Sequence, residues 1–336
     1  MPNSQNNNNK ISSLAEMMQM FRAFQPSRIM LTAYETDVFT VIDNQPLSSE
    51  DIAKKIGADK RAIERLMNAV TALGYAIKAD DLYSNTELTS KFLVKGKATY
   101  LGGISHTNNL WNTWSKLTET VRTGTSPMGT HINDRDPNWL RYFINAMHSR
   151  GRALALEIAK MIDFSGIYKI LDVGGGSGIF ASTFVRQNEN MNAVVFDLPN
   201  VIPITQEFIE KENLQGRVTC SMGDYLKDDI GSGFDLIYLS AVIHSNSENE
   251  NKLLIKKCFD ALNAGGKIVI IDFAMNEERT EPLGGTIFAI NMLVGTERGD
   301  TFKKNEIYSW LTEASFVDLE IQDVYEGNSL IIARKL

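Results

Sequence analysis

The stretch Lys169-Ile-Leu-Asp-Val-Gly-Gly-Gly-Ser-Gly178 decides the fold class of this 336-residue chain. An apolar run leads into alternating glycines, Gly174, Gly176 and Gly178, and an apolar helical pattern follows from Ile179. A strand, a glycine turn and a helix in this order predict a loop that approaches a ligand closely at a helix N-terminus. The dinucleotide fingerprint would need a further glycine at position 179, which this chain lacks.

From this stretch up to residue 272, short β-rich runs alternate with helical patterns. The runs are KILDVG, NAVVFD, RVTCSM, FDLIYLS and GGKIVIID. The alternation predicts an α/β fold with a Rossmann-like, doubly wound, mostly parallel sheet and helices on both faces. Two strand patterns around residues 326–328 then predict a C-terminal antiparallel hairpin.

The first hundred residues follow a different pattern. A short helix, capped by Ser48 or Ser49 and ended by Gly57, precedes a helix over residues 60–73 and two short strands around an Asp-Asp turn. Helix, turn, helix and hairpin predict a winged-helix domain. Basic and acidic residues balance between residues 50 and 81, whereas a groove-reading helix needs a basic excess. We therefore expect a structural or dimerising role and no nucleic acid partner.

Composition narrows the function classes further. The net charge of −7 disfavours nucleic acids and anionic membranes as general partners. The two cysteines, Cys220 and Cys258, are far apart and indicate buried thiols rather than a disulfide or zinc site. No apolar run reaches the ~20 residues of a membrane span, and the polar N-terminus lacks a signal-peptide pattern. We expect a cytoplasmic protein whose first ten residues or so are disordered.

Carboxylates end three successive predicted strands. Asp172 precedes the glycines, where it would repel a pyrophosphate and attract an ammonium group. Asp197, followed by Leu198, lies about 20 residues beyond the glycines, where an acid commonly binds ribose hydroxyls. Asp224 and Tyr225 suit an adenine amino group and ring. Asp197 as an N-cap and Asp224 as a turn cap are the alternatives, but all three together predict S-adenosyl-L-methionine, with S-adenosyl-L-homocysteine as product and no metal.

These motifs, together with Phe143-Ile-Asn-Ala-Met147, FDLPNVI and a histidine after the fourth strand, resemble the class I S-adenosylmethionine-dependent O-methyltransferases of the caffeate and acetylserotonin type. The resemblance covers nearly the whole chain. It implies a homodimer formed through an N-terminal dimerisation domain, here residues 1–104, and a methyltransferase domain over 105–336 whose segment 105–165 contributes to the substrate pocket. The residues expected at the cofactor are Phe143, Met147, Asp172, Gly174, Gly176, Asp197, Leu198, Asp224, Tyr225 and Ser240.

The resemblance also implies that His244 is the general base, with Asp272 as its acidic partner and Asp300 as a second acid. The family commonly has His-Asp-Trp here, whereas this chain has His244-Ser245-Asn246. The ring therefore depends more on Asp272. Alternatives for His244 are a core histidine bonded to backbone, or a metal ligand, although no second ligand lies at close spacing.

The leading hypothesis is methyl transfer to a hydroxyl oxygen of a small aromatic, isoprenoid or polyketide acceptor. C-methylation or a non-methylating reaction with the same cofactor, and a DNA-binding regulator that responds to S-adenosylmethionine, are the alternatives. The candidate pocket residues are Trp111, Trp114, His106, His131, Asn291 and Met292.

Overall fold

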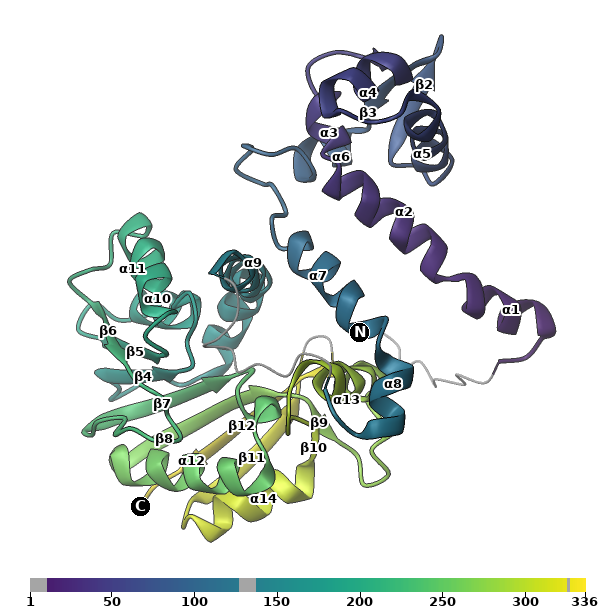
Figure 1. The fold of residues 1–336 in the computed structure, drawn as a ribbon. Coiled ribbons are helices and arrows are strands. Elements are labelled where there is room, and N and C mark those ends of the chain that lie inside the picture. The colour runs from purple at the N-terminus through teal and green to yellow at the C-terminus, as the bar shows by residue number, and fades with distance from the viewer. Residues whose placement is uncertain (1–10, 127–136, 325–326) are drawn as a thin grey trace. The chain divides into compact units, whose positions relative to one another are not determined.

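The structure is a computed structural model that describes residues 11–126, 137–324 and 327–336, apart from the side chain at position 138. His131 and the first ten residues lie outside these ranges. The chain divides into two compact units, Met1–Asn108 and Asn109–Leu336, shown as a ribbon in Figure 1. Within the described ranges, no helix is long and apolar enough to cross a membrane.

The first unit contains the expected winged helix. Its elements are α1 (Leu14–Arg22), α2 (Phe24–Glu35), α3 (Val38–Val41), β1 (Leu47–Ser48), α4 (Ser49–Ile56), α5 (Lys60–Ala72), β2 (Ala76–Ala79), β3 (Leu82–Asn85) and α6 (Glu87–Phe92). The Ser48 hydroxyl accepts a hydrogen bond from the backbone amide of Asp51, and Gly57 ends α4 with a φ of 70°. The hairpin gains a third strand, since β1 pairs with β3 in the order β1-β3-β2.

The core of the first unit leaves α1 uncovered. Phe39, Ile52, Met67 and Val70 are completely or almost completely buried between α3, α4 and α5. By contrast, α1 has no buried residue, although apolar side chains make up most of it. An apolar helix of this kind is typically covered by a partner molecule.

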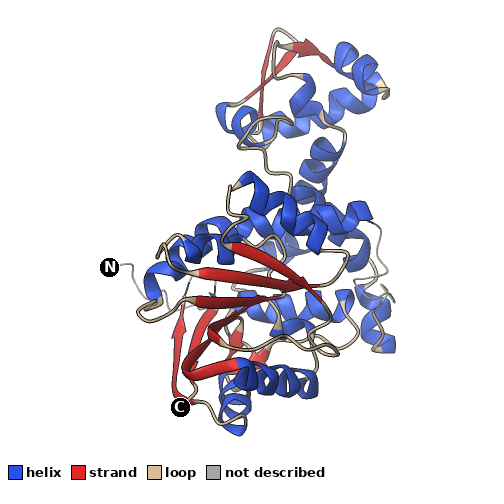
Figure 2. Ribbon diagram, turned by 90° about the vertical axis from the view of Figure 1, so that its left-hand side faces the viewer, coloured by secondary structure: helices blue, strands red, loops and turns tan. Residues whose placement is uncertain are grey.

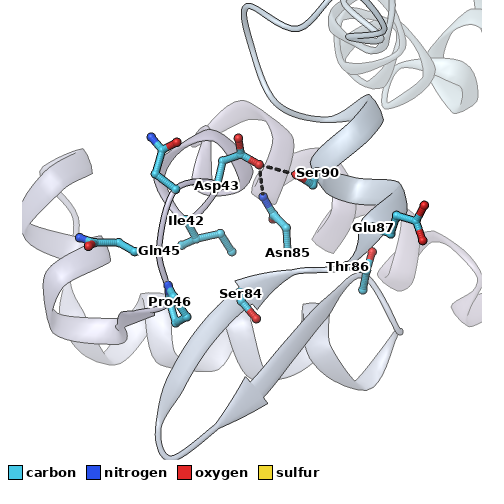
Figure 3. Close-up of a pocket in the computed structure, with 10 residues that line it drawn as sticks. Ile42, Asp43, Gln45, Pro46, Ser84, Asn85, Thr86, Glu87 and Ser90 are labelled. Atoms are coloured by element: carbon cyan, nitrogen blue, oxygen red, sulfur yellow. Dashed lines mark hydrogen bonds between the residues drawn. The ribbon is translucent and has the colours of Figure 1, made fainter.

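A small hollow of about 230 Å³ lies at the base of the wing (Figure 3). Asp43 at its wall accepts hydrogen bonds from Lys97 Nζ at 2.8 Å, from the Ser90 hydroxyl and from Asn85 Nδ2. The bond from Lys97 is the main cause that lowers the pKa of Asp43. The carboxylate is thus already neutralised by the protein, and it braces α3 against the segment after α6.

The second unit begins with helices and continues as an α/β sheet. Its elements are α7 (Ile104–Trp114, which starts in the first unit), α8 (Leu117–Thr123), α9 (Pro137–Met161), β4 (Lys169–Val173), α10 (Ile179–Val185), β5 (Asn192–Asp197), α11 (Ile202–Lys211), β6 (Val218–Met222), β7 (Phe234–Ser240), η2 (Ile243–Ser245), α12 (Glu248–Ala261), β8 (Leu262–Asp272), β9 (Ala274–Met275), α13 (Leu283–Gly295), β10 (Phe302–Lys303), α14 (Lys304–Glu313), β11 (Val317–Asp323) and β12 (Ser329–Arg334).

The sheet has seven strands in the order β11-β12-β8-β7-β4-β5-β6, drawn in red in Figure 2. Strands β4 to β8 run parallel, and β12 pairs antiparallel with β8 and with β11. The expected doubly wound sheet with a C-terminal hairpin is confirmed. The strand order reverses between β4 and β7, and ligands of such sheets bind outside the carboxyl ends of the strands at this switch point.

Helices cover both faces of the sheet because the strands are apolar on both faces (Figure 1). Leu171 belongs to a core with Leu254 of α12 and Trp310 of α14. Its neighbour Ile170 belongs to the opposite core, with α9 and α10. The buried layers fix the strand ends, and the loops at these ends carry the candidate site.

Candidate active site at the carboxyl edge of the sheet

The glycine loop between β4 and α10 takes a conformation that suits glycine. Gly174, Gly176 and Gly178 have φ values of 66°, 56° and 71°, in the left-handed region that other residues avoid. Gly175 has ordinary φ but no room, since an added Cβ would lie 2.7 Å from the carboxyl carbon of Asp172. The repeated glycines therefore serve both the turn and the close packing beneath it.

Asp197 at the end of β5 holds this loop in place. One carboxylate oxygen accepts the backbone amide of Gly176 at 2.8 Å, and the other accepts that of Leu198 at 2.7 Å. Burial nevertheless raises the pKa of Asp197 to about 6. Asp172 is more deeply buried, and burial raises its pKa to about 7. Asp172 accepts a hydrogen bond from the amide of Ala181 at 3.3 Å, which directs it beneath the loop rather than to the open edge.

Asp224 and Tyr225 follow β6, as expected. Asp224 accepts the amide of Leu226 at 3.0 Å and forms an ion pair with Lys227 at 2.8 Å. The Tyr225 hydroxyl donates to Asn246 Oδ1 at 3.0 Å. Ser240 ends β7 beside Ile271 of β8. The three expected residues therefore lie at the carboxyl ends of two strands, β6 and β7, on the same edge of the sheet.

Helix α9 lies over the glycine loop and carries Phe143 and Met147. Phe143 stacks on Trp139 with ring centroids 5.3 Å apart. A Cβ at Gly176 would lie 3.6 Å from Ile144, which places α9 within van der Waals reach of the loop. The helix that carries both expected residues therefore packs against the loop.

His148 on α9 was not anticipated as a site residue. Its Nδ1 lies 3.0 Å from the hydroxyl of Ser177 in the glycine loop, and its ring stacks on Phe208 of α11. Burial, and then the positive charge of Arg152, lower the pKa of His148. No periodic pattern in the sequence indicates these contacts, because they join residues from two helices and a loop.

His244 lies in the η2 turn and is almost fully buried. Its Nδ1 is 2.9 and 3.0 Å from the two carboxylate oxygens of Asp272, which also accept the amides of His244 and Phe273. A carboxylate oxygen accepts hydrogen bonds, so this contact selects Nδ1 as the donor and, in the neutral ring, leaves the lone pair on Nε2. Phe288 of α13 meets the ring edge to face at 4.7 Å. Asp272 and Phe288 together fix the orientation of the His244 ring.

Asp300 was expected to be a second acid beside the His244 ring, but its carboxylate has other partners. Its carboxylate forms an ion pair with Arg279 at 2.9 Å and accepts the amide of Thr301 at 2.8 Å. The contact between Asp300 and His244 is through the backbone: the amide of Asp300 donates a hydrogen bond to the carbonyl of His244 at 3.0 Å. Arg279 draws the carboxylate away because it also binds Glu306 and closes a local charge cluster.

The expected acceptor residues divide between the units. Trp114 Nε1 donates to Asn291 Oδ1 at 2.9 Å, and Met292, next to Asn291 on α13, is buried. Trp111 lies one turn before Trp114 on α7. His106 belongs to the first unit. In the described residues no group of three or more histidine, cysteine, aspartate or glutamate side chains is arranged to hold a metal.

Comparisons with known proteins agree with this geometry. Residues 114–317 match an O-methyltransferase domain, and residues 18–95 match an O-methyltransferase dimerisation domain. The 3-hydroxy-5-methyl-1-naphthoate 3-O-methyltransferase of Streptomyces sahachiroi is 30% identical over 294 residues, which cover 86% of this chain and 85% of that protein. The tetracenomycin polyketide synthesis 8-O-methyl transferase TcmO of Streptomyces glaucescens is 26% identical over 95% of this chain and 96% of its own length.

A solved structure of human N-acetylserotonin methyltransferase in complex with SAM has a TM-score of 0.85 at 21% identity, and the match covers 98% of this chain and 99% of that one. The dimerisation domain supports a homodimer. The chain belongs to the S-adenosylmethionine-dependent O-methyltransferases that join a dimerisation domain to an O-methyltransferase domain.

Proposed function

We propose that this enzyme methylates a hydroxyl group of a flat, polycyclic aromatic acceptor, with His244 as the general base. The observation that carries the proposal is the buried pair of His244 and Asp272, in which the carboxylate binds Nδ1 and leaves Nε2 for a substrate proton. A base that is oriented in this way contributes typically 10²- to 10⁴-fold to a rate.

The residues at the glycine loop fit the cofactor. Asp172 is buried and Asp197 is half-buried, and the pKa values of both are raised mainly by burial, so the site favours a ligand that brings positive charge. S-adenosylmethionine carries an ammonium group and a sulfonium, and when bound it supplies an electrophilic methyl group. We assign the ribose hydroxyls to Asp197 and the adenine side to Asp224 and Tyr225.

The protein's own residues have two tasks in this reaction: they position the reacting groups, and they remove the proton of the acceptor hydroxyl. Asp272 fixes the tautomer and the orientation of His244, and Phe288 packs against the ring. An apolar wall of this kind limits water at the base, which strengthens the electrostatic interactions inside the site. The proton of the acceptor hydroxyl moves to Nε2 while the oxygen attacks the methyl carbon in line with sulfur.

The acceptor side combines aromatic rings with one oriented amide. Phe288 packs between His244 and Phe273, with ring centroids 4.7 and 5.0 Å away. One turn further along α13, Asn291 Oδ1 is held by Trp114, so its Nδ2 remains as a donor. Rings bind an aromatic face, and an amide donor suits a carbonyl or carboxylate oxygen on the same acceptor.

The names of the relatives point to the same acceptor class. The relative that is 30% identical acts on a hydroxynaphthoate, and TcmO belongs to polyketide synthesis. A relative at 25% identity, OxyT of Streptomyces rimosus, is named an N,N-dimethyltransferase. The acceptor atom therefore varies among relatives, and it must be tested directly.

A panel of acceptors tests the proposal. Purified enzyme and S-adenosylmethionine are incubated with 3-hydroxy-5-methyl-1-naphthoate, its 3-methoxy analogue, a simple phenol and a matched aromatic amine. We expect release of S-adenosylhomocysteine with the hydroxynaphthoate and a product that mass analysis identifies as a methyl ether. Transfer to the amine alone, to a ring carbon, or conversion without S-adenosylhomocysteine release would contradict the proposed reaction.

A further inference from the structure

A chain of buried amide hydrogen bonds connects the loop after β6 with the turn that carries His244. The Tyr225 hydroxyl donates to Asn246 Oδ1 at 3.0 Å, Asn246 Nδ2 donates to Asn251 Oδ1 at 3.0 Å, and Asn251 Nδ2 donates to the Ile243 carbonyl at 2.9 Å. Asn246 is 3% exposed and Asn251 is fully buried. This series of hydrogen bonds ends at Ile243, the residue directly before His244.

The last acceptor fixes the direction of every bond. A backbone carbonyl only accepts, so Asn251 must present Nδ2 to Ile243 and Oδ1 to Asn246. Asn246 must then present Nδ2 to Asn251, which leaves its Oδ1 to accept from Tyr225. Each amide therefore has one orientation, and the phenol must act as donor. Burial raises the pKa of Tyr225 and so keeps this donor protonated.

The surrounding elements strengthen the connection. Asn246 directly follows the η2 turn, and Ser247 caps α12 through a capping box with Glu250. The same helix reaches the loop after β6 a second time, because Lys257 Nζ donates to the carbonyls of Tyr225 and Asp228, each at 2.8 Å. Helix α12 thus holds the loop by its backbone, while Asn246 holds it by the tyrosine side chain.

We propose that Asn246 is a positioning residue that keeps the His244 turn in register with the cofactor-binding loop at Tyr225. The position is one where the family commonly has tryptophan, and the amide gives it two directional bonds that an indole, a donor only, lacks. The inference rests on the proposed role of His244 as base. Loss of a buried partner strands a polar atom, which is costly and displaces the groups around it.

Three variants distinguish the effects of the hydrogen bonds at the two ends of this series. Tyr225→Phe breaks only the first bond, and we expect S-adenosylhomocysteine affinity to fall about 3- to 10-fold. Asn246→Asp keeps an acceptor for Tyr225 but loses the donor to Asn251, so we expect kcat to fall about tenfold with affinity nearly unchanged. Asn246→Ala breaks both bonds and should show both losses. Asn263→Ala is the matched control, since Asn263 bonds Asp235 at the amino end of β7.

Calorimetry with S-adenosylhomocysteine and single-turnover methylation of the hydroxynaphthoate give the two readouts, and thermal denaturation reports folding. In a cycle with Tyr225→Phe, the double variant should bind no more weakly than Asn246→Ala alone. In a His244→Ala background, Asn246→Asp should cause no further loss of rate. A purely structural role would lower the Tm of Asn246→Asp and leave kcat within twofold of wild type.

The outcomes separate this inference from the proposed function. If His244→Ala itself keeps the wild-type rate, the role of the base is wrong. If His244→Ala is slow but Asn246→Asp is not, or if the affinity losses of Tyr225→Phe and Asn246→Ala multiply, only the positioning role of Asn246 is wrong. If Asn246→Ala does not fold, the Asp and Phe variants still decide the question.

Discussion

Two groups of buried or half-buried carboxylates in this molecule contrast with each other. Asp43, in the first unit, lines a hollow and is neutralised by Lys97 with help from Ser90 (Figure 3), and its pKa is lowered. At the sheet edge of the second unit, Asp172 is buried and Asp197 is half-buried, and burial raises the pKa values of both.

A hollow alone therefore does not mark a functional site. The protein stabilises the ionised form of Asp43 by itself, so nothing is left for a ligand to satisfy. At Asp172 and Asp197 the protein supplies backbone amides, and no ion pair of either carboxylate occurs among the described residues. An uncompensated buried acid stores free energy that a cationic ligand can release.

Asp272 is a third buried carboxylate, and removal of its partner His244 should produce the largest loss of reaction rate. We expect His244→Ala to slow single-turnover methyl transfer by roughly 10²- to 10⁴-fold, because general base catalysis is lost. Affinity for S-adenosylhomocysteine should stay within a few-fold of wild type. Asp272→Asn should act in the same direction but less severely. Equal losses of affinity and rate would place His244 in cofactor binding instead.

Two matched variants, each lacking one carboxylate, test whether the two groups differ in ligand binding. Asp197→Ala loses charge-assisted bonds to ribose that contribute on the order of 1.5–3 kcal/mol each, so S-adenosylhomocysteine affinity should fall about 10²-fold or more. Asp43→Ala should leave that affinity unchanged. Calorimetry on both variants measures the contrast. If the two variants bind equally well, raised pKa values at the sheet edge have no bearing on the ligand.

The pH dependence of binding should sharpen the same contrast. The pKa of Asp197 is about 6 before ligand binds, and ribose binding requires the ionised form. Below pH 6 a proton must leave on binding, so affinity should fall by up to tenfold per pH unit. Above about pH 7 affinity should reach a plateau. Calorimetry from pH 5 to 8 in buffers of different ionisation enthalpy would detect the released proton, and Asp197→Ala should flatten the profile.

The smallest effect is expected in the first unit. Lys97→Met removes the main partner of Asp43 and should lower the free energy of unfolding by about 1 kcal/mol, because the lysine is partly exposed and its ion pair is screened. Methyl transfer and cofactor affinity should not change. Urea denaturation with a parallel activity assay tests this prediction. A loss of activity at unchanged stability would give the wing hollow a role that its geometry does not suggest.

Some features of this protein follow from the sequence because they are local or periodic. The alternation of strand and helix patterns predicted the sheet, the glycines predicted the loop after β4, and Ser48 with Gly57 predicted the ends of α4. Placement of Asp197 at a strand end followed from the same alternation. Each of these signals depends on neighbouring residues in the chain, for which backbone sterics and side-chain periodicity are sufficient.

Other features depend on packing between distant segments, and only the tertiary structure decided them. The family resemblance implied Asp300 as a second acid beside His244, but Arg279, on a separate loop, binds its carboxylate. His148 reaches Ser177, and Asn246 links Tyr225 to the turn that carries His244, through contacts that no periodic pattern encodes. The raised pKa of Asp197 likewise comes from burial, which is a property of the assembled layers. Local patterns set where functional side chains leave the strands, and packing determined what each of them meets.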